Sequence, residues 1–515
     1  MKKLYITGLL LVLSALLQAQ TFEWLATPAI TFSANPEGIG YPTATDQLGN
    51  TFVCGFKDNA HPYTDIFGNL WFLKFNPSGQ VVFSKVISGT VNAYKMLVDG
   101  AGNLYIAAAY IDEIQVDDLH LTTNLQGVKP ILLKFDNNGN LLWHKTIPDM
   151  FVEHFKALAI DEQQNIYIGY DTYMDSYIEK LDANGNSLQL ITQTQVKSIS
   201  SVSIDTEGNI FATGSCAETN VSFNGTPMTN TLPYNTYLVK YNSYGQMQWM
   251  HFVEDVTCPE PQVLVRTPDE VYFSSYLFGN YTFGNLTTEG PINGFSDFFL
   301  AKLNSNGVYQ WVKEVPGAGE VIVGNRNYLA LDTNGNLYLT ARTRGTIQWS
   351  PTISTQTAGF NHDLIVLKYN PQGEVLWAKL AGGNSEDRAD GITVLPDNNV
   401  VLTGIVNGDV TFDALTHNSA GFAYYPFVSK LNTTTLNVNS PSLHSISVYP
   451  NPAQTTLVLA AKDYTETASI YNLLGQKLKT VNCRNETTTI DITTLPKGTY
   501  FIRLENNQVI RFVKA

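Results

Sequence analysis

Short runs of apolar residues, separated by tight-turn residues, recur along most of the chain. In the stretch Val366–Lys379, one run ends at Lys368-Tyr369-Asn370, Pro-Gln-Gly follows, and a second run begins with Val-Leu-Trp. Pro favours the first half of a tight turn, and Gly accepts the positive φ that closes it. The stretch therefore predicts a β-hairpin, and its repetition predicts an all-β chain.

Each copy of this hairpin has a Lys, an apolar residue and an Asn or Asp, with Gly three residues later. The last copy lacks the Gly. Six intervals separate the first and last Lys, so the period is about 59 residues, which is typical of a propeller or solenoid. We expect each Lys to cover the sheet with its stem while its ammonium reaches water or a neighbouring turn. The copies begin at Lys74, Lys134, Lys180, Lys240, Lys302, Lys368 and Lys430.

A second repeated sequence is an Asp turn, which joins two β-rich segments. An Asp at the start can accept backbone N–H bonds, and the Gly-Asn that usually follows tolerates the left-handed region. The same residues resemble part of a calcium loop, but no Glu follows at the spacing that such a loop needs. We interpret them as structural turns, with calcium binding as the alternative. The copies are Asp46–Asn50, Asp99–Asn103, Asp161–Asn165, Asp205–Asn209 and Asp332–Asn336, with degenerate copies at Asp269 and Asp397.

One repeat thus contains four strands: strand a before the Asp turn, b after it, c ending in the Lys, and d carrying an aromatic residue. Four antiparallel strands in each repeat predict a propeller blade. Trp24 precedes the first Asp turn, whereas no strand d follows Lys430. The sequence therefore predicts a seven-bladed β-propeller closed by the N-terminal strand. The residues assigned to the aromatic position are Trp24, Phe83, Trp143, Leu190, Trp249, Trp311 and Trp377.

The two ends of the chain differ from the repeats. Residues 1–19 begin with Met-Lys-Lys and continue with an apolar run that is too short for a membrane span, so we predict a signal peptide cleaved near Ala19. The propeller is expected to occupy residues 20–432, a polar linker residues 433–445, and a further β-rich unit residues 446–515. We predict no transmembrane segment.

Charge and reactive residues exclude several function classes. The net charge is −14 and only 15% of residues are charged, which argues against nucleic-acid binding. The eight histidines are scattered, and no sequence signature of a metal centre, nucleophile elbow or phosphate loop is present, so we predict no metal and no cofactor. Cys216 and Cys258 are expected in loops on one face, where an oxidising destination would let them form a disulfide; two isolated thiols is the alternative.

The connections from b to c and from d to a are long and share one face, which we call the long-loop face. Several b-to-c connections share an internal pattern, so we predict an extra hairpin in each. The d-to-a loop at Gly382–Asp390 gathers three carboxylates and an Arg, a composition suited to acid–base work or ligand binding; an ordinary solvated loop is the alternative. Exposed aromatics on this face are candidates for stacking on sugars or peptides. The candidate ligand-binding residues are Glu386, Asp387, Arg388, Asp390, Tyr281 and Tyr424.

Residues 446–515 form a different pattern of short strands punctuated by Pro and Gly, which predicts a small β-sandwich. Its Tyr-Pro-Asn-Pro opening, Leu-Gly-Gln turn, Leu-Pro-Lys-Gly-Thr-Tyr-Phe-Ile strand and terminal Arg-Phe-Val-Lys resemble the type A C-terminal sorting domain of the bacterial type IX secretion system. The resemblance implies export through that machinery, followed by release or attachment to the cell surface. The residues that carry the sorting signal are Pro450, Asn451, Pro452, Gly475, Gly498 and Lys514.

The preceding region resembles, more loosely, the SBBP β-propeller repeats, through its Asp turns and the Gly-Gly-Asn-Ser-Glu-Asp before one strand a. That resemblance implies a fold rather than an activity. We interpret the protein as a secreted or surface-displayed binding or scaffold module for an unknown extracellular glycan or protein. The alternative is a polysaccharide hydrolase or lyase with a carboxylate site on the long-loop face.

Overall fold

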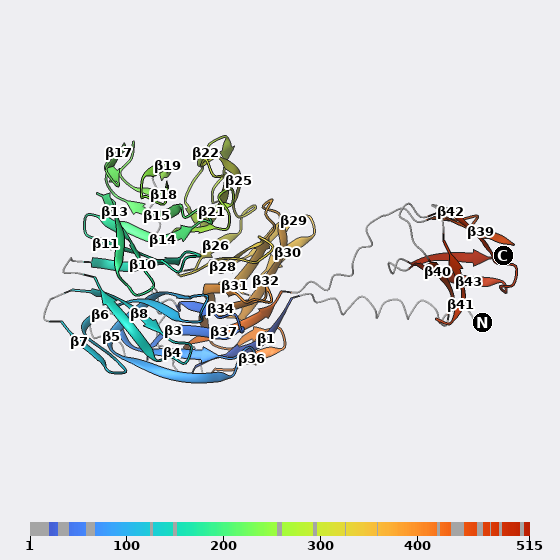
Figure 1. The fold of residues 1–515 in the computed structure, drawn as a ribbon, viewed down its shortest axis with the longest axis horizontal. Helices are drawn as coiled ribbons and strands as arrows, with labels where there is room; N and C mark the ends of the chain where they lie inside the picture. Colours follow the sequence, from blue (N-terminus) through green and yellow to red (C-terminus); the bar gives the residue numbers. More distant parts are fainter. Residues whose placement is uncertain are drawn as a thin grey trace. The chain divides into compact units, whose positions relative to one another are not determined.

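The structure is a computed structural model, and its regular elements are all strands in the residues that it describes (Figure 1). The prediction of an all-β chain is thereby confirmed. The chain divides into two compact units, residues 1–434 and 435–515, which are treated separately. The described residues are 20–28, 41–57, 67–123, 127–147, 152–254, 260–291, 296–324, 326–357, 359–419, 423–433, 447–460, 467–473, 475–483, 487–504 and 509–515.

The first unit consists of antiparallel groups of four neighbouring strands, with β5 last in one group and first in the next. The first groups are β2 (Thr43–Thr45), β3 (Thr51–Lys57), β4 (Gly68–Phe75) and β5 (Val81–Val98); then β5, β6 (Leu104–Val116), β8 (Lys129–Phe135) and β9 (Leu141–Thr146). Next come β10 (Val152–Ile160), β11 (Ile166–Thr172), β12 (Ser176–Leu181) and β13 (Ser187–Thr194); then β14 (Ser198–Ile204), β15 (Ile210–Cys216), β18 (Asn235–Tyr241) and β19 (Met247–Glu254).

The remaining groups follow the same order, except that the first strand of one group is split in two. They are β20 (Gln262–Val265), β21 (Val271–Leu277), β24 (Asp297–Leu303) and β25 (Tyr309–Lys313); then β26 (Glu320–Val323) with β27 (Leu329–Leu331), β28 (Leu337–Arg344), β31 (Asp363–Tyr369) and β32 (Val375–Gly383). The last group is β33 (Arg388–Val394), β34 (Val400–Asn407), β37 (Tyr424–Asn432) and β1 (Thr21–Ala26).

The burial of each strand follows its position in the group. Every residue of β15 and β18 is buried, because these two middle strands have a neighbouring group against each face. The outer strand β19 is mostly half-buried. The sequences of the middle strands are therefore nearly continuous runs of buried residues, whereas buried and exposed residues are mixed in the outer strand β19.

The predicted extra hairpins are present in five of the described b-to-c connections, whereas the short connection from β11 to β12 has none. Their small strands extend some of the groups at the long-loop face, as where β16 pairs with β13 and β35 with β32. The strands are β7 (Leu119–Thr122) paired with β6, β16 (Asn220–Phe223) with β17 (Thr226–Thr229), β22 (Thr282–Phe283) with β23 (Leu286–Thr287), β29 (Thr346–Ser350) with β30 (Ile353–Gln356), and β35 (Val410–Phe412) with β36 (Leu415–His417).

The first strands of the groups contact one another in the order β2, β5, β10, β14, β20, β27 and β33, and β33 contacts β2. The N-terminal strand β1 pairs antiparallel with β37, and Trp24 lies opposite Lys430. A hydrogen bond of 2.7 Å from Ser429 Oγ to the Trp24 carbonyl accompanies this pairing.

A repeated contact joins neighbouring groups where the aromatic residue of one strand d covers the turn Gly of the next group. A Cβ atom added to Gly307 would lie 2.8 Å from a ring carbon of Trp249, and one on Gly373 equally close to Trp311. The indole N–H of Trp249 also donates to the Ser305 carbonyl at 2.9 Å. Only Gly allows this approach, and we call the contact the aromatic–glycine joint. The same joint links Trp24 to Gly79, Phe83 to Gly139 and Trp143 to Gly185.

One assignment of the aromatic position was wrong. Gln189, not Leu190, lies opposite Lys180, and Gln189 covers Gly245. Leu190 is half exposed on the other face. A strand's two faces alternate, so a shift of one residue moved the assignment to the wrong side.

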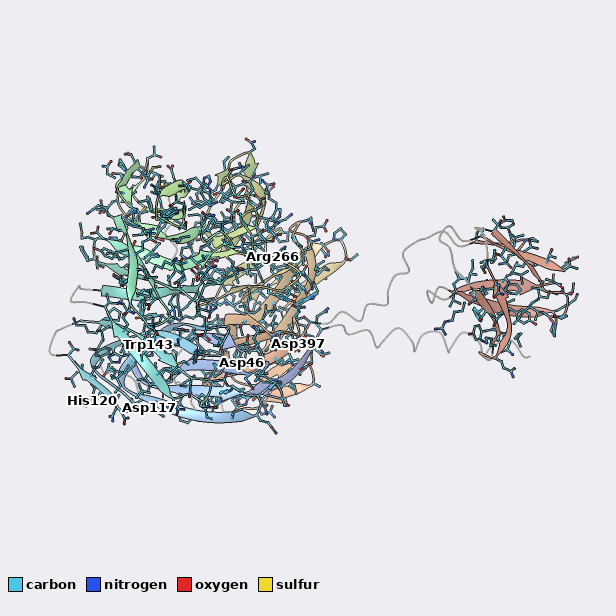
Figure 2. The ribbon with its side chains drawn as sticks, in the orientation of Figure 1. Asp46, Asp117, His120, Trp143, Arg266 and Asp397 are labelled. Carbon is cyan, nitrogen blue, oxygen red and sulfur yellow. The ribbon has the colours of Figure 1, made fainter. Side chains whose placement is uncertain are left out.

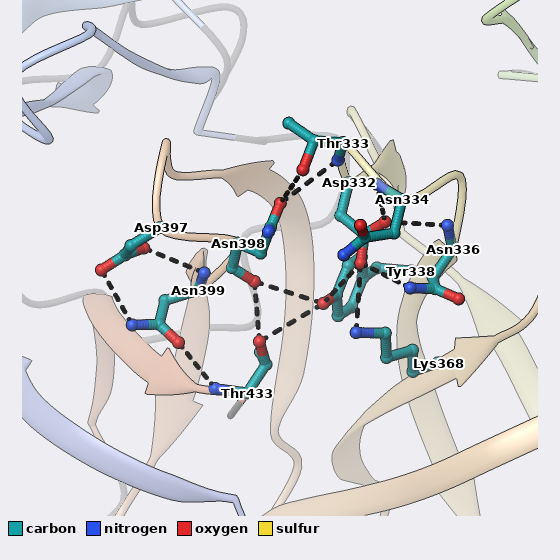
Figure 3. Close-up of polar contacts among 10 residues, drawn as sticks. All are labelled: Asp332, Thr333, Asn334, Asn336, Tyr338, Lys368, Asp397, Asn398, Asn399 and Thr433. Atoms are coloured by element: carbon teal, nitrogen blue, oxygen red, sulfur yellow. Dashed lines mark hydrogen bonds and ion pairs between the residues drawn. The ribbon is translucent and has the colours of Figure 1, made fainter. Parts of the chain in front are cut away.

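The Asp turns close as predicted, and Asp46 begins one of them (Figure 2). In the turn of Figure 3, Asp332 Oδ1 accepts the backbone N–H of Asn336 at 2.8 Å, and Oδ2 accepts its side-chain amide at 2.8 Å. Lys368 Nζ lies 3.1 Å from the same carboxylate, which confirms that a strand-c Lys reaches an Asp turn. In the degenerate turn Asn398 takes the positive φ of 64° that Gly has elsewhere. Asn tolerates this conformation, so the missing Gly leaves the turn intact.

The second unit has two sheets that share one hydrophobic core, to which Leu457, Ile490, Ile502 and Phe512 contribute. The strands are β38 (Ser447–Tyr449), β39 (Thr456–Ala460) and β42 (Thr487–Asp491) in one sheet, and β41 (Lys477–Asn482), β40 (Thr467–Asn472), β43 (Gly498–Leu504) and β44 (Val509–Lys514) in the other.

Candidate functional site

The predicted acidic loop between β32 and β33 places its carboxylates against three different sets of partners. Glu386 binds His362 Nδ1 at 2.9 Å and Arg342 Nη1 at 3.0 Å. The other ring nitrogen of His362 lies 3.3 Å from Glu320. Burial alone would raise the pKa of Glu386, but the hydrogen bond from His362 and the charges of His362 and Arg342 hold it below its ordinary value. Glu386 keeps 22% of its side chain exposed, so it is the carboxylate of this loop that solvent reaches.

Asp387 is fully buried, and its carboxylate accepts hydrogen bonds from two backbone N–H groups. Its Oδ2 accepts the N–H of Gly383 at 2.7 Å, and its Oδ1 accepts the N–H of Asn407 at 2.8 Å. Burial raises the pKa of Asp387 to about 8, and the nearby charges of Asp363 and Glu386 add to that rise. A ligand would have to displace these N–H groups to reach the carboxylate.

Asp390 is also fully buried, and both of its oxygens lie 3.1 Å from Arg388 Nε. Burial raises the pKa of Asp390, although Arg388 counteracts it. These two residues line a cavity of about 30 Å³ together with Tyr276 and Arg342. That volume accommodates a water molecule, whereas pockets for drug-sized ligands usually measure several hundred Å³.

The two candidate aromatics belong to different parts of the long-loop face. Tyr281 is partly buried and packs beside its own hairpin, where its backbone pairs with Thr288 at 3.0 Å. Tyr424 is partly buried at the start of β37 and packs against the core that includes Val53 and Ile405. The ligand-binding role of the six candidate residues stays a prediction.

The predicted disulfide lies partly outside the described residues, because Cys258 is not among them. Cys216 is buried at the end of β15, and its Sγ lies 3.7 Å from the side-chain amide of Asn230. Burial raises the pKa of this thiol to about 11. The pairing stays a prediction.

A group of charged residues that the sequence did not predict comes together among the first strands. Glu260 Oε1 lies 2.8 Å from Arg326 Nη1 and 3.7 Å from Lys156 Nζ. The Arg326 guanidinium lies over the Tyr94 ring, 5.6 Å from its centre. Next to Tyr94, Lys95 is enclosed by protein but keeps part of its surface accessible. We call Lys95, Lys156, Glu260 and Arg326 the inner cluster.

The electrostatics of the inner cluster are unbalanced. Burial lowers the pKa of Lys95 to about 8; Glu260 counteracts this effect, whereas Arg326 adds to it. Of the residues that the structure describes, none forms an ion pair or hydrogen bond with the Lys95 ammonium. Lys156 and Arg326 therefore both pair with Glu260, and the charge of the buried Asp390 also acts on Arg326.

In the second unit, the structure brings together most of the residues of the predicted sorting signal. The side chain of Asn451 donates to the Arg511 carbonyl at 3.2 Å and accepts the N–H of Val513 at 2.9 Å. This places the Pro450-Asn451-Pro452 segment against β44, where Lys514 pairs with Gly498. Gly475 lies apart, in the turn before β41, with a φ of 78°.

In the described part of the chain, no set of three or more His, Cys, Asp or Glu side chains is placed to hold a metal ion. The same residues contain no helix with the length and hydropathy of a membrane span.

Comparisons of the whole chain with known proteins give distant likenesses. An uncharacterized WD repeat-containing protein of Acanthamoeba polyphaga mimivirus is 22% identical over 55% of this chain, which spans 27% of that protein's length. Among solved structures, a catalytically inactive virginiamycin B lyase from Staphylococcus aureus has a TM-score of 0.41 at 8% identity, covering 79% of this chain and 98% of the lyase chain. The Dos1 propeller has a TM-score of 0.39 at 10% identity, covering 81% of this chain and 97% of the other. Scores this low assign no activity.

The second unit has a specific match. Residues 447–514 match the family described as the secretion system C-terminal sorting domain. This match agrees with the resemblance drawn from its Tyr-Pro-Asn-Pro and Leu-Pro-Lys-Gly sequences. The C-terminal unit therefore carries a sorting domain, which indicates export by the type IX secretion system and either secretion or attachment to the outer cell surface.

Proposed function

We propose that this protein is an extracellular binding or scaffold module: a seven-bladed β-propeller closed by its N-terminal strand, exported by means of a C-terminal β-sandwich that is the sorting domain. The observation that carries the proposal is the sorting domain itself, placed after a chain of repeated four-strand groups. An exported repeat fold with a broad loop face is suited to binding other molecules at the cell surface.

Two contacts support ring closure. β33 contacts β2, so the sequence of first strands returns to its start. The joint between Trp24 and Gly79 also links the last group to the first in the same way as Trp249 and Gly307 link two middle groups. In a closed ring every group has a neighbour on both sides, and the joint between Trp24 and Gly79 gives the last group this contact with the first.

The arrangement of the acidic loop favours binding over hydrolysis. A glycoside hydrolase needs two carboxyl groups that flank a bound sugar. Asp387 and Asp390 are both fully buried, and the cavity beside Asp390 has the volume of a water molecule. Exposed residues such as Phe360, at 94% exposure, leave the loop face itself open to a large partner.

Export is tested by expressing the full chain, and a chain that ends at residue 433, in a bacterium with a working type IX system. We expect the full chain in the medium or on the cell surface and the shortened chain in the periplasm. Equal surface delivery of both chains would contradict the proposal. A substitution of Asn451 by Ala in the full chain serves as a finer probe, because it removes both hydrogen bonds to β44.

The binding role is tested by exposing the purified mature chain to a glycan array and to outer-membrane proteins, with product analysis for each glycan that binds. We expect binding without turnover. Turnover that Glu386→Gln abolishes would support the polysaccharide-acting alternative, because Glu386 is the solvent-reached carboxylate of the acidic loop. Glu374→Gln, in a turn of the same group, is the control.

A further inference from the structure

We infer that the inner cluster is a binding site for a single oxyanion group, such as a sulfate, phosphate or carboxylate. This inference rests on the proposed binding role and names the chemical class of one ligand. The site lies among the first strands of the propeller and is distinct from the acidic loop.

Side chains from strands that are not neighbours converge at this site. Lys95 belongs to β5, Lys156 to β10, Glu260 precedes β20, and Arg326 lies between β26 and β27. In the order of first-strand contacts, β14 stands between β10 and β20, yet Lys156 and Glu260 lie 3.7 Å apart. Arg326 similarly reaches Tyr94 of β5, although β33 and β2 stand between their strands. Lys156, Glu260 and Arg326 therefore meet among the first strands, and Lys95 of β5 is near enough for the charges of Glu260 and Arg326 to act on its ammonium.

The charged groups of the inner cluster are incompletely paired. One carboxylate oxygen, Glu260 Oε1, serves both Arg326 and Lys156, and Lys95 adds a third cation with no ion-pair partner among the described residues. The nearest buried carboxylate, Asp390, is paired with Arg388, and its charge also acts on Arg326. The Lys95 ammonium is therefore the cation of the cluster that has no ion-pair partner among the described residues, and an unpaired ammonium is costly in a partly desolvated place.

The donor groups of the inner cluster suit the shape of an oxyanion. A guanidinium presents N–H groups in a planar fork, and two ammonium groups add donors from other directions, an arrangement that fits an oxyanion. Arg326 keeps only 4% of its side chain exposed, whereas Lys156 and Glu260 each keep 16%. The cluster is therefore enclosed but reachable by a small group, whether a free ion or the charged end of a larger molecule.

The test is calorimetric titration of the purified mature chain with sodium sulfate, phosphate and acetate, at an ionic strength held constant with sodium chloride. We expect saturable binding of at least one oxyanion with a stoichiometry near one. Lys95→Gln and Lys156→Gln should each weaken that binding by about tenfold or more, because each removes one charge-assisted hydrogen bond. Lys145→Gln, which removes a partly buried ion pair with Glu179 at 3.3 Å outside the cluster, should leave the affinity unchanged.

A second measurement keeps the inference falsifiable if a variant folds poorly. In low-salt buffer, Lys95→Gln should unfold at a higher temperature than the wild type, because it removes an uncompensated charge; a saturating oxyanion should narrow or reverse that difference. A wild type that binds none of the three anions would overturn the inference, as would unchanged binding by both Lys95→Gln and Lys156→Gln. Failure here would leave export and glycan or protein binding untouched, since those are measured separately.

Discussion

Two regions of the first unit are built in opposite ways. One is the turn end, where the Asp turns and the aromatic–glycine joints lie, and the other is the inner cluster. At the turn end the same contacts recur: an Asp carboxylate closes its own turn, as Asp205 does, and an aromatic ring covers the next group's Gly, as Trp249 covers Gly307. The inner cluster occurs once, and its four residues come from different groups. Repeated local contacts hold the groups together, whereas the unrepeated contacts are the place where one chain can acquire a ligand of its own.

The difference should also appear in how each region responds to pH and substitution. The recurring Asp turns and aromatic–glycine joints hold no carboxyl group whose pKa burial raises into the neutral range. Contacts that occur once include the buried carboxyl groups of Asp387 and Asp297, whose pKa values burial raises to about 8 and about 7. The predictions below test this contrast, beginning with the largest expected effect.

Raising the pH should destabilise the first unit through Asp387. Burial raises the folded-state pKa of Asp387 to about 8, so the folded chain holds this proton more tightly than the unfolded chain does. Stability is therefore fully present below about pH 4 and is lost as the pH rises towards 8, at about 1.4 kcal/mol for each pH unit at most. Asp297, with a pKa raised by burial to about 7, adds a smaller loss of the same sign.

Thermal unfolding at pH 5 and pH 8.5 measures this effect. We expect the midpoint of the wild type to fall, and Asp387→Asn to reduce the fall. Asp182→Asn is the control, because hydrogen bonds from Asn186 hold the pKa of that exposed turn carboxyl below its ordinary value and it has no proton to lose in this range. A midpoint that rises with pH in the wild type would show that Asp387 is ionised in the folded chain.

Breaking an aromatic–glycine joint should be the most damaging change at the turn end. Gly307 has a φ of +76°, and a Cβ there would lie 2.8 Å from the Trp249 ring, so Gly307→Ala combines backbone strain with a clash. We expect a loss of about 3 kcal/mol in the free energy of unfolding, measured by denaturant titration.

Gly225→Ala separates the two causes. Gly225 has a φ of +84°, but a Cβ at this position would have no neighbour within 4 Å, so only the strain of about 1 kcal/mol applies. Equal losses for the two variants would mean that the ring of Trp249 moves aside freely and that the joint does not stabilise the groups.

Removing the carboxylate of one Asp turn should have an intermediate effect. Asp205 is buried and accepts the backbone N–H of Asn209 at 2.8 Å and that of Glu207 at 3.0 Å. Asp205→Ala leaves these donors without a partner, at a cost of about 2 kcal/mol in denaturant unfolding. Asp182→Ala removes the same pattern from an exposed turn, where water replaces the carboxylate, so its effect should be clearly smaller.

The smallest effect is expected from the repeated Lys. Lys368 lies 3.1 Å from Asp332, with its Nζ 4.8 Å from the centre of the Tyr338 ring. Lys368→Met keeps the apolar stem and removes the charge, so the free energy of unfolding should fall by only about 0.5–1 kcal/mol. A loss as large as that of Gly307→Ala would show that these Lys residues, rather than the joints, hold the groups together.

The turn end could be predicted from the sequence because each of its parts is local. The Asp turn, the Gly three residues after the Asn, and the Trp at the same place in strand d are all visible within one repeat. Even the assignment that failed, Leu190 in place of Gln189, missed by one residue on a strand whose faces alternate. The sorting domain was equally accessible, because Asn451 and Gly498 stand in sequences typical of its family.

The inner cluster and the fates of the loop carboxylates could not be predicted in this way. Lys95 is one of two Lys residues in β5, and nothing near it in the sequence indicates that the charges of Glu260 and Arg326, more than 160 residues later, act on it. The sequence predicted one cluster from Glu386, Asp387 and Asp390. In the structure the three carboxylates have different partners: His362, the backbone N–H of Gly383, and Arg388 respectively. Such sites depend on contacts between groups, which no single repeat records.

The pairing of β1 with β37 has a consequence for the order of events during export. Trp24 and Ser429, whose hydrogen bond belongs to this pairing, are 405 residues apart in the chain. The last group cannot be completed until nearly all of the first unit has emerged from a ribosome or a narrow translocation channel. The first unit therefore reaches its full set of strand pairs only when residues near both of its ends are available to pair.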